Sequence, residues 1–372
     1  MKKIGIITLY HNNINYGGLL QAYALAKFIN SMGYCAEQIL TDFISSSDDK
    51  FWNQGSGMLG SMNKFIKHCI YIFNKKNFIN RRATFQRFEN KIPHSQCLYN
   101  KENIKDSNLI YDAFITGSDQ VWNVSWYRPE YFLSFVENKP RISYSASMPN
   151  TLDNKYAKIV KEHLDKFDSI SVREKQTVSV LEELTEKKVK QVVDPTLLLD
   201  TKDWDKICTK RLVNKPYIFC YLLSTNRHTK KEIDKVARLK NMQIVTLPNV
   251  GGINAYDCVF GDIKLYNVSP EEFISLIKYS SYVITDSFHA TVFSCLYRKQ
   301  FVAISRAGKA DMNSRLYSLL DMFDAKERFL NNETDYKQIE TNLDKQFIPN
   351  EKNFSDAVKD SKQFLTEALS RV

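Results

Sequence analysis

A histidine at the start of a predicted helix is the residue best placed for chemistry in this sequence. Tyr282 to Ile284 is a short β-branched run typical of a strand, and Phe288 to Tyr297 is predicted to be a helix. Asp286 or Ser287 can cap this helix, because its side-chain oxygen can accept from a free N–H of the first turn. His289 then lies in that first turn, where the helix dipole favours an anion.

The position of His289 allows both a functional and a structural interpretation. Open α/β sheets bind ligands beyond the carboxyl ends of their strands, and an imidazole can carry a proton near neutral pH. The alternative is a capping histidine on an ordinary helix. Lys309 and Arg315, in the basic stretch from Arg306, can supply cations to the same region.

An arginine occupies another predicted corner between a strand and a helix. The run from Ser169 to Val172 is a predicted strand, and Arg173 follows it directly. A guanidinium there can bind a carboxylate or phosphate through two hydrogen bonds. The alternative is a surface salt bridge to Glu174 or to a neighbouring residue.

Compact polar residues and a tryptophan follow the predicted strand from Leu109 to Thr116. Trp122 can stack on a sugar ring, and Asp119 can accept hydrogen bonds from sugar hydroxyls. Together with Gly117, Ser118 and Gln120, these two residues form a predicted saccharide-binding surface. The alternative is an Asx-turn with Trp122 in the core.

The first predicted corner follows a buried strand, Lys3 to Leu9, and contains Asn15, Tyr16, Gly17 and Gly18. It has neither a G-x-G-x-x-G fingerprint nor a P-loop. Paired glycines at such a corner are more often tight-turn residues than phosphate cradles, yet they also allow a ligand to approach the backbone closely.

The chain has 372 residues, which exceeds what one hydrophobic core usually organises, so we expect two α/β domains. The N-terminal domain is predicted over residues 1–205, with a basic helical insertion at about 45–105. The C-terminal domain is predicted over residues 206–345. A helix within 346–372 is expected to pack back on the N-terminal domain.

The formal net charge is +10, and much of it lies between residues 64 and 91, where eight Lys or Arg residues accompany one acid. Aromatic residues are interleaved with these charges. The segment can be a helix with a solvated basic face, or it can contact anionic lipid headgroups or an anionic substrate. No nucleic-acid-binding module accompanies the charge, so we expect no nucleic-acid partner.

The remaining composition favours a cytoplasmic protein. The seven cysteines form no C-x-x-C, so neither a disulfide framework nor a metal site is predicted. No apolar run reaches the roughly 18 residues of a membrane span. We therefore expect a cytoplasmic location, with peripheral contact at the inner face of the membrane if the basic segment binds lipid.

The motifs at these corners, taken together, resemble those of the polysaccharide pyruvyl transferase family. The resemblance implies two Rossmann-like domains that face each other across a cleft, similar to GT-B glycosyltransferases. The acceptor side is then the N-terminal domain, and the donor side is the C-terminal domain. It also implies transfer of a pyruvyl group from phosphoenolpyruvate to sugar hydroxyls, usually as a ketal, without a cofactor. The motifs are Asn15–Leu25, Ile115–Asn123, Ser171–Glu174 with Val193–Pro195, and Ile284–Phe293.

The resemblance and the chemistry of the donor suggest a role for each candidate residue. His289 is the candidate acid, and Asp119 is the candidate acceptor of the hydroxyl proton. Some family members carry arginine where this chain has Ser287, so anion binding here falls to the helix start and to other cations. The donor-binding candidates are Arg173, Ser287, Phe288, Lys309 and Arg315. The acceptor-binding candidates are Asn15, Tyr16, Gly17, Gly18, Gly117, Ser118, Gln120 and Trp122.

Two other functions remain open from the sequence. A GT-B-like glycosyltransferase that uses a nucleotide sugar would have the same fold. A non-catalytic glycan-binding protein would depend on Trp122 and Asp119 but not on His289. For the transferase, the expected partners are phosphoenolpyruvate and a free or lipid-linked saccharide of a cell-surface polysaccharide.

Overall fold

The computed structural model describes residues 1–43, 76–77, 79–149, 152–224, 226–248, 259–306 and 310–372. Residues 64–75 and 78 of the basic segment at 64–91 lie outside these ranges, as does Lys309. No described helix is both long and apolar enough to cross a bilayer.

The N-terminal domain is built on a parallel sheet with the strand order β3-β2-β1-β4-β5. The central strand, β1 (Lys3–Ile7), pairs with β2 (Cys35–Thr41) and β4 (Ala113–Thr116). The outer strands are β3 (His94–Tyr99) and β5 (Arg141–Ser143). Every residue of β4 is buried, as expected for a parallel strand covered on both faces.

The prediction of one insertion over residues 45–105 is wrong at its end, because β3 belongs to the main sheet. Half of its side chains are exposed, as on a strand at the edge of a sheet, so the sequence lacks the apolar run of a buried strand. Beyond β5, at the edge of the sheet opposite β3, the strands β6 (Ile170–Val172) and β7 (Val189–Gln191) pair with each other. Isolated bridges from the β5 region connect β6 to the main sheet.

The C-terminal domain repeats this plan. Its parallel sheet has the order β10-β9-β8-β11-β12-β13, so within each domain the first and fourth strands lie side by side at the centre, as in Rossmann folds. The strands are β8 (Tyr217–Tyr221), β9 (Gln243–Thr246), β10 (Ile263–Lys264), β11 (Tyr282–Thr285), β12 (Gln300–Ile304) and β13 (Phe329–Leu330).

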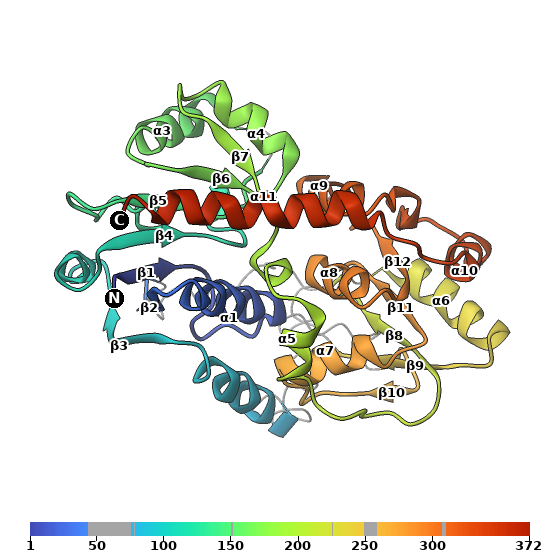
Figure 1. Cartoon of the computed structure of the whole chain (residues 1–372). Coiled ribbons are helices and arrows are strands. Elements are labelled where there is room, and N and C mark those ends of the chain that lie inside the picture. Colours follow the sequence, from blue (N-terminus) through green and yellow to red (C-terminus); the bar gives the residue numbers. More distant parts are fainter. Residues whose placement is uncertain (44–75, 78, 150–151, 225, 249–258, 307–309) are drawn as a thin grey trace, which may run out of the picture.

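Helices connect the strands and cover the sheets (Figure 1). They are α1 (Tyr16–Ser31), α3 (Asn154–Leu164), α4 (Lys175–Glu182), α5 (Thr201–Asp205), α6 (Arg227–Leu239), α7 (Pro270–Lys278), α8 (Phe288–Leu296), α9 (Ala310–Met322), α10 (Tyr336–Asp344) and α11 (Glu351–Leu369). Residues 79–89 are also helical. The predicted strand and helix on either side of Ser287 are confirmed as β11 and α8.

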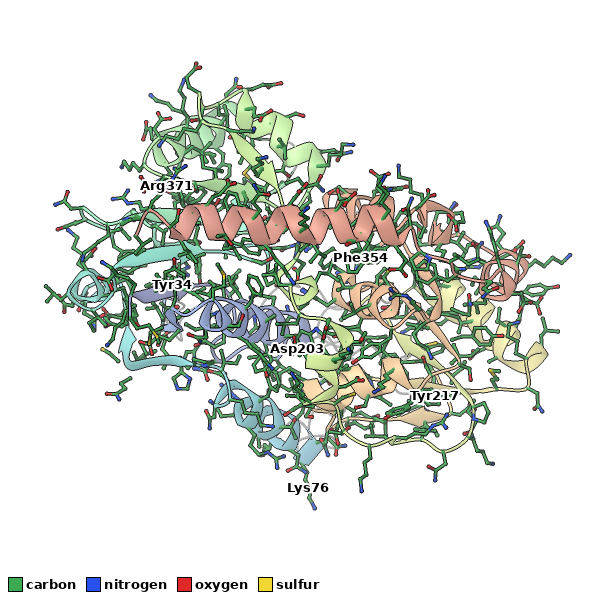
Figure 2. All side chains as sticks on the ribbon, viewed as in Figure 1. Tyr34, Lys76, Asp203, Tyr217, Phe354 and Arg371 are labelled. Carbon is green, nitrogen blue, oxygen red and sulfur yellow. The ribbon has the colours of Figure 1, made fainter. Side chains whose placement is uncertain are left out.

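The C-terminal helix, α11, packs on both domains and not only on the N-terminal one (Figure 1). Near its start, Phe354 stacks on Phe323 of the C-terminal domain. Further along, Ser361 accepts a hydrogen bond from the backbone of Val193, and the last turn accepts one from Tyr34. Figure 2 labels Phe354 toward one end of α11 and Tyr34 and Arg371 toward the other.

The start of α1 carries an aromatic contact between the domains. Tyr16 is buried, and its ring stacks on Phe273 of α7 with 4.5 Å between the ring centroids. Its hydroxyl donates to the carbonyl oxygen of Val268 and accepts from Arg81 of the basic segment. Phe85, on the same helix as Arg81, is also buried, so this part of the basic segment packs against the core.

Candidate active site

The corners at the centres of the two sheets meet at the domain interface. Gly17 follows β1, and a Cβ atom at this position would lie 1.8 Å from Nδ1 of His289, which follows β11. Asp119, after β4, lies 3.8 Å from Arg315 of α9. Open α/β sheets bind ligands beyond the carboxyl ends of their central strands. In this protein the carboxyl ends of the central strands of the two sheets therefore face each other.

His289 lies between two elements of the N-terminal domain. Its ring contacts the backbone of α1 at Gly17, where only a glycine leaves room for it. Its Nε2 atom is buried and lies 3.5 Å from Oδ2 of Asp194, beyond a good hydrogen-bond length. The proposed acid thus comes from the C-terminal domain, and its nearest carboxylate comes from the N-terminal domain.

Asp194 is a buried carboxylate with fixed partners. Its Oδ1 accepts hydrogen bonds from the backbone amide and the hydroxyl of Thr196, at 3.0 and 2.7 Å. Its Oδ2 accepts from Arg173 at 2.9 Å and from Ser118 at 3.2 Å. Burial alone would raise the pKa of Asp194, but its neighbours, with His289 the strongest, lower it well below its ordinary value.

Arg173 is buried among carboxylates and an aromatic ring. Its Nε donates to Glu174 at 3.1 Å, and its guanidinium carbon lies 4.2 Å from the centroid of the Phe288 ring. The pair with Glu174 exists, but both side chains are buried, so it is not a surface salt bridge. Burial alone would lower the pKa of Arg173, but the carboxylates, Glu174 foremost, raise it above its ordinary value.

Asp119 lies between two guanidinium groups from opposite domains. Its Oδ1 is 3.9 Å from Nη2 of Arg173 and 3.8 Å from Nη1 of Arg315, both longer than hydrogen bonds. Gln120 accepts from Arg315 at 2.9 and 3.0 Å when its amide oxygen faces the guanidinium. Burial and the nearby Arg173 lower the pKa of Arg315 to about 10.

The backbone after β4 explains how Asp119 reaches this position. Gly117 has φ +114°, and a Cβ there would lie 2.1 Å from the carbonyl oxygen of Tyr144. Asp119 itself adopts φ 63°, in the left-handed region that aspartate tolerates better than most residues. This sharp turn brings the carboxylate to the end of the strand.

The start of α8 has the predicted cap. The side chain of Ser287 accepts from the amide of Ala290, in the third position of the helix. Asp286 does not cap α8, because its carboxylate accepts from the amides of Leu223 and Ser224, each at 2.7 Å. Arg306 donates to the backbone oxygen of Asp286 at 3.1 Å and so brings another cation to this end of β11.

The prediction that Trp122 stacks on a sugar is wrong. Its side chain is fully buried and stacks on Phe132, with 5.0 Å between ring centroids and 3° between planes. The indole N–H donates to the carbonyl oxygen of Tyr131 at 3.1 Å. Trp122 therefore belongs to the hydrophobic core of the N-terminal domain, as the alternative interpretation held.

Trp122→Ala is expected to lower the free energy of unfolding by about 3–5 kcal/mol, the usual cost of deleting a large buried aromatic side chain. Urea denaturation followed by circular dichroism measures this change. Unchanged stability combined with a loss of saccharide affinity would restore Trp122 as a binding residue.

Most of the proposed acceptor-binding residues at the first corner are engaged within the protein. Tyr16 is 1% exposed, so the prediction that it contacts the acceptor is wrong. Asn15 caps α1 by accepting from the amides of Gly17 and Gly18. A Cβ at Gly18 would lie 3.0 Å from the carbonyl oxygen of Leu9, so both glycines serve close packing within the protein.

Ser118 is also held by the protein. It is fully buried, its amide donates to Gln21, and the single proton of its hydroxyl is shared between the carbonyl oxygen of Ser145 at 3.0 Å and Asp194 at 3.2 Å. Among the predicted residues, the structure thus gathers Asp119, Gln120, Arg173, Phe288, His289 and Arg315 into one charged cluster.

Sequence reasoning assigned no role to Asp194, which connects Arg173 with His289. The available signal was its place in Val193–Pro195, one of the motifs that carry the family resemblance. No group of three or more His, Cys, Asp or Glu side chains arranged to hold a metal ion occurs in the part of the chain that the structure describes.

Comparisons with known proteins agree on the family and the fold. The sequence model of the polysaccharide pyruvyl transferase family matches residues 15–308, and the curated proteins gave no match. UDP-GlcNAc 2-epimerase from Methanocaldococcus jannaschii is similar in structure, with 11% identity, a TM-score of 0.57 and 100% of each chain covered.

Two further epimerases have similar structures. The enzyme from Neisseria meningitidis, bound to UDP-GlcNAc, has 10% identity and a TM-score of 0.50, with 100% of each chain covered. The enzyme from Rickettsia bellii has 12% identity and a TM-score of 0.51, with 100% of this chain and 96% of that chain covered. At such identities the likeness concerns the fold alone, which is GT-B-like with two Rossmann-like domains.

Proposed function

The chain belongs to the polysaccharide pyruvyl transferase family, and we propose that it transfers the pyruvyl group of phosphoenolpyruvate to saccharide hydroxyls. The product is a ketal, and phosphate is released. The acceptor in this proposal is a saccharide of a cell-surface polysaccharide or its free or lipid-linked precursor.

The observation that carries the proposal is the pair of buried guanidinium groups at the domain interface. Nη2 of Arg173 is buried and has no hydrogen-bond partner among the described residues. It shares the carboxylate of Asp119 with Arg315, at distances too long for hydrogen bonds. Phosphoenolpyruvate carries both a carboxylate and a phosphate, and a guanidinium can bind either through two hydrogen bonds.

The start of α8 adds a further anion-binding feature. The Ser287 cap accepts from the amide of Ala290 and not from those of Phe288 and His289, in the first two positions of the helix. The first amides of a helix have no partner within the helix itself. Free amides at a helix start favour a phosphate or carboxylate. Ser287 caps the helix without adding charge, so the cations of this site come from Arg173, Arg315 and the nearby Arg306.

The proposed reaction balances with the groups of this site. His289 donates a proton to the methylene carbon of phosphoenolpyruvate, which leaves a cation-like centre at the adjacent carbon. A saccharide hydroxyl attacks that carbon and passes its proton to Asp119. A second hydroxyl then displaces phosphate, whose C–O bond breaks as the ketal closes. Of the two hydroxyl protons released, one offsets the proton added to carbon and the other leaves with phosphate.

Phosphate release from phosphoenolpyruvate in the presence of candidate oligosaccharides tests the proposal. We expect release that depends on the acceptor, together with a product that is heavier by one pyruvyl ketal. We also expect phosphoenolpyruvate to raise the melting temperature, because a ligand that binds only the folded state stabilises it. Protection by UDP- or GDP-sugars without protection by phosphoenolpyruvate would instead identify a nucleotide-sugar transferase.

A further inference from the structure

One buried carboxylate of the N-terminal domain lies between the proposed acid and the proposed donor-binding arginine. The same oxygen atom, Oδ2 of Asp194, is 2.9 Å from Nη1 of Arg173 and 3.5 Å from Nε2 of His289. The arginine and the histidine come from different domains. Asp194 therefore lies between the two groups, hydrogen-bonded to Arg173 and within ion-pair distance of His289.

Asp194 is itself held rigidly. Thr196 occupies its other oxygen with two hydrogen bonds, and Ser118 donates to the shared oxygen. The side chain is 1% exposed, so bulk water cannot replace these partners. A buried carboxylate that must stay ionised and immobile is suited to orient its neighbours, and not to exchange protons with a substrate.

On the side of the imidazole away from Asp194, the ring also contacts the N-terminal domain. The start of α1 contacts the ring at Gly17, and α1 is fixed to the C-terminal domain by the stacking of Tyr16 on Phe273. The ring of His289 thus lies between the backbone of α1 and the carboxylate of Asp194. Both contacts depend on the association of the two domains.

We propose that Asp194 is a positioning residue that aligns the imidazole of His289 with the guanidinium of Arg173 across the domain interface. The proposal rests on the proposed function, because it takes His289 as the proton donor and Arg173 as a donor-binding residue. The reaction requires the proton donor and the substrate to be correctly oriented relative to each other, so this alignment should affect mainly the rate of the chemical step.

A matched pair of variants tests this role. Asp194→Asn and Glu174→Gln each remove one buried carboxylate partner of Arg173, at 2.9 and 3.1 Å, but only Asp194 lies beside His289. We expect both variants to raise KM for phosphoenolpyruvate. Only Asp194→Asn should also lower kcat sharply, by about 100-fold or more, because it misplaces the acid.

The imidazole can be observed directly, without turnover. Nitrogen-15 NMR of the histidine rings, with His289 assigned from its substitution by glutamine, should show a changed Nε2 resonance in Asp194→Asn. The resonance in Glu174→Gln should match the wild type. If Asp194→Asn and Glu174→Gln give the same kcat and the same His289 resonance, Asp194 is an ordinary partner of Arg173 and the proposal is wrong.

A milder variant keeps the test decisive if Asp194→Asn fails to fold. Thr196→Val keeps the charge of Asp194 and removes only the hydroxyl that holds its Oδ1 at 2.7 Å. We expect kcat to fall by about tenfold, the scale of a lost hydrogen bond to a charged group. A wild-type kcat and a wild-type His289 resonance in this variant would overturn the proposal.

These readouts separate the two proposals. If the wild-type protein releases no phosphate from phosphoenolpyruvate with any of the acceptors, the proposed function is wrong. The NMR comparison of Asp194→Asn with Glu174→Gln needs no substrate, so it still decides whether Asp194 orients His289.

Discussion

His289→Ala is expected to abolish phosphate release from phosphoenolpyruvate while the chain stays folded. General acid catalysis by one side chain typically contributes about 100- to 10,000-fold to the rate. Asp194 would remain fixed by Thr196 and Arg173, so the main local change is a small cavity beside Gly17. The measurements are kcat for phosphate release and the melting temperature by circular dichroism.

The matched control for this variant is a second buried histidine in the N-terminal domain. His163 stacks on Phe132 at 4.8 Å between ring centroids and interacts with the hydroxyl of Tyr127, away from the charged cluster. His163→Ala should lower stability through lost packing and leave kcat near the wild-type value. Turnover near normal in His289→Ala, or an equal loss in both variants, would remove His289 from the mechanism.

Gly17→Ala is expected to lower kcat by about 100-fold or more, because the new methyl group takes the place of the imidazole. A Cβ at this position would lie 1.8 Å from Nδ1 of His289, far closer than any van der Waals contact allows. Elsewhere in a helix interior, replacing glycine by alanine usually stabilises by up to about 1 kcal/mol. Here the overlap should force His289 aside or separate the domains, and the melting temperature should fall.

A double-mutant cycle identifies the imidazole as the cause. In the His289→Ala background the ring is absent, so Gly17→Ala should no longer destabilise the protein. Urea denaturation of the wild type, both single variants and the double variant measures this coupling. Equal destabilisation by Gly17→Ala in both backgrounds would show that the alanine disturbs α1 itself and not the contact with His289.

Local sequence patterns predicted the elements and corners well, because their signals lie within a few residues. The β-branched run before Asp286, the serine cap and the apolar helix correctly predicted β11 and α8. The same reasoning placed Arg173 at the end of β6. The polar edge strand β3 was missed because it lacks the hydrophobic run that marks a buried strand.

The side-chain partners could not be predicted in the same way, since they depend on contacts distant in sequence. Trp122 lies beside compact polar residues, a combination typical of a sugar-binding site, but the fold packs its side chain against Phe132 and Phe167. Gly17 allows the close approach expected of a glycine at a corner, yet the group that approaches is the ring of His289. The first contact depends on the packing within the N-terminal domain, and the second depends on the association of the two domains.

The bonds of α11 to both domains restrict how the interface can open. A helix of 19 residues is roughly 28 Å long and behaves as a stiff rod. Arg298 of the C-terminal domain binds Glu351 at its start, and Tyr34 of the N-terminal domain binds the backbone of Leu369 at its end. A relative motion that preserves these bonds has to pivot at α11. The domains then separate least beside α11 and most at the edge farthest from it.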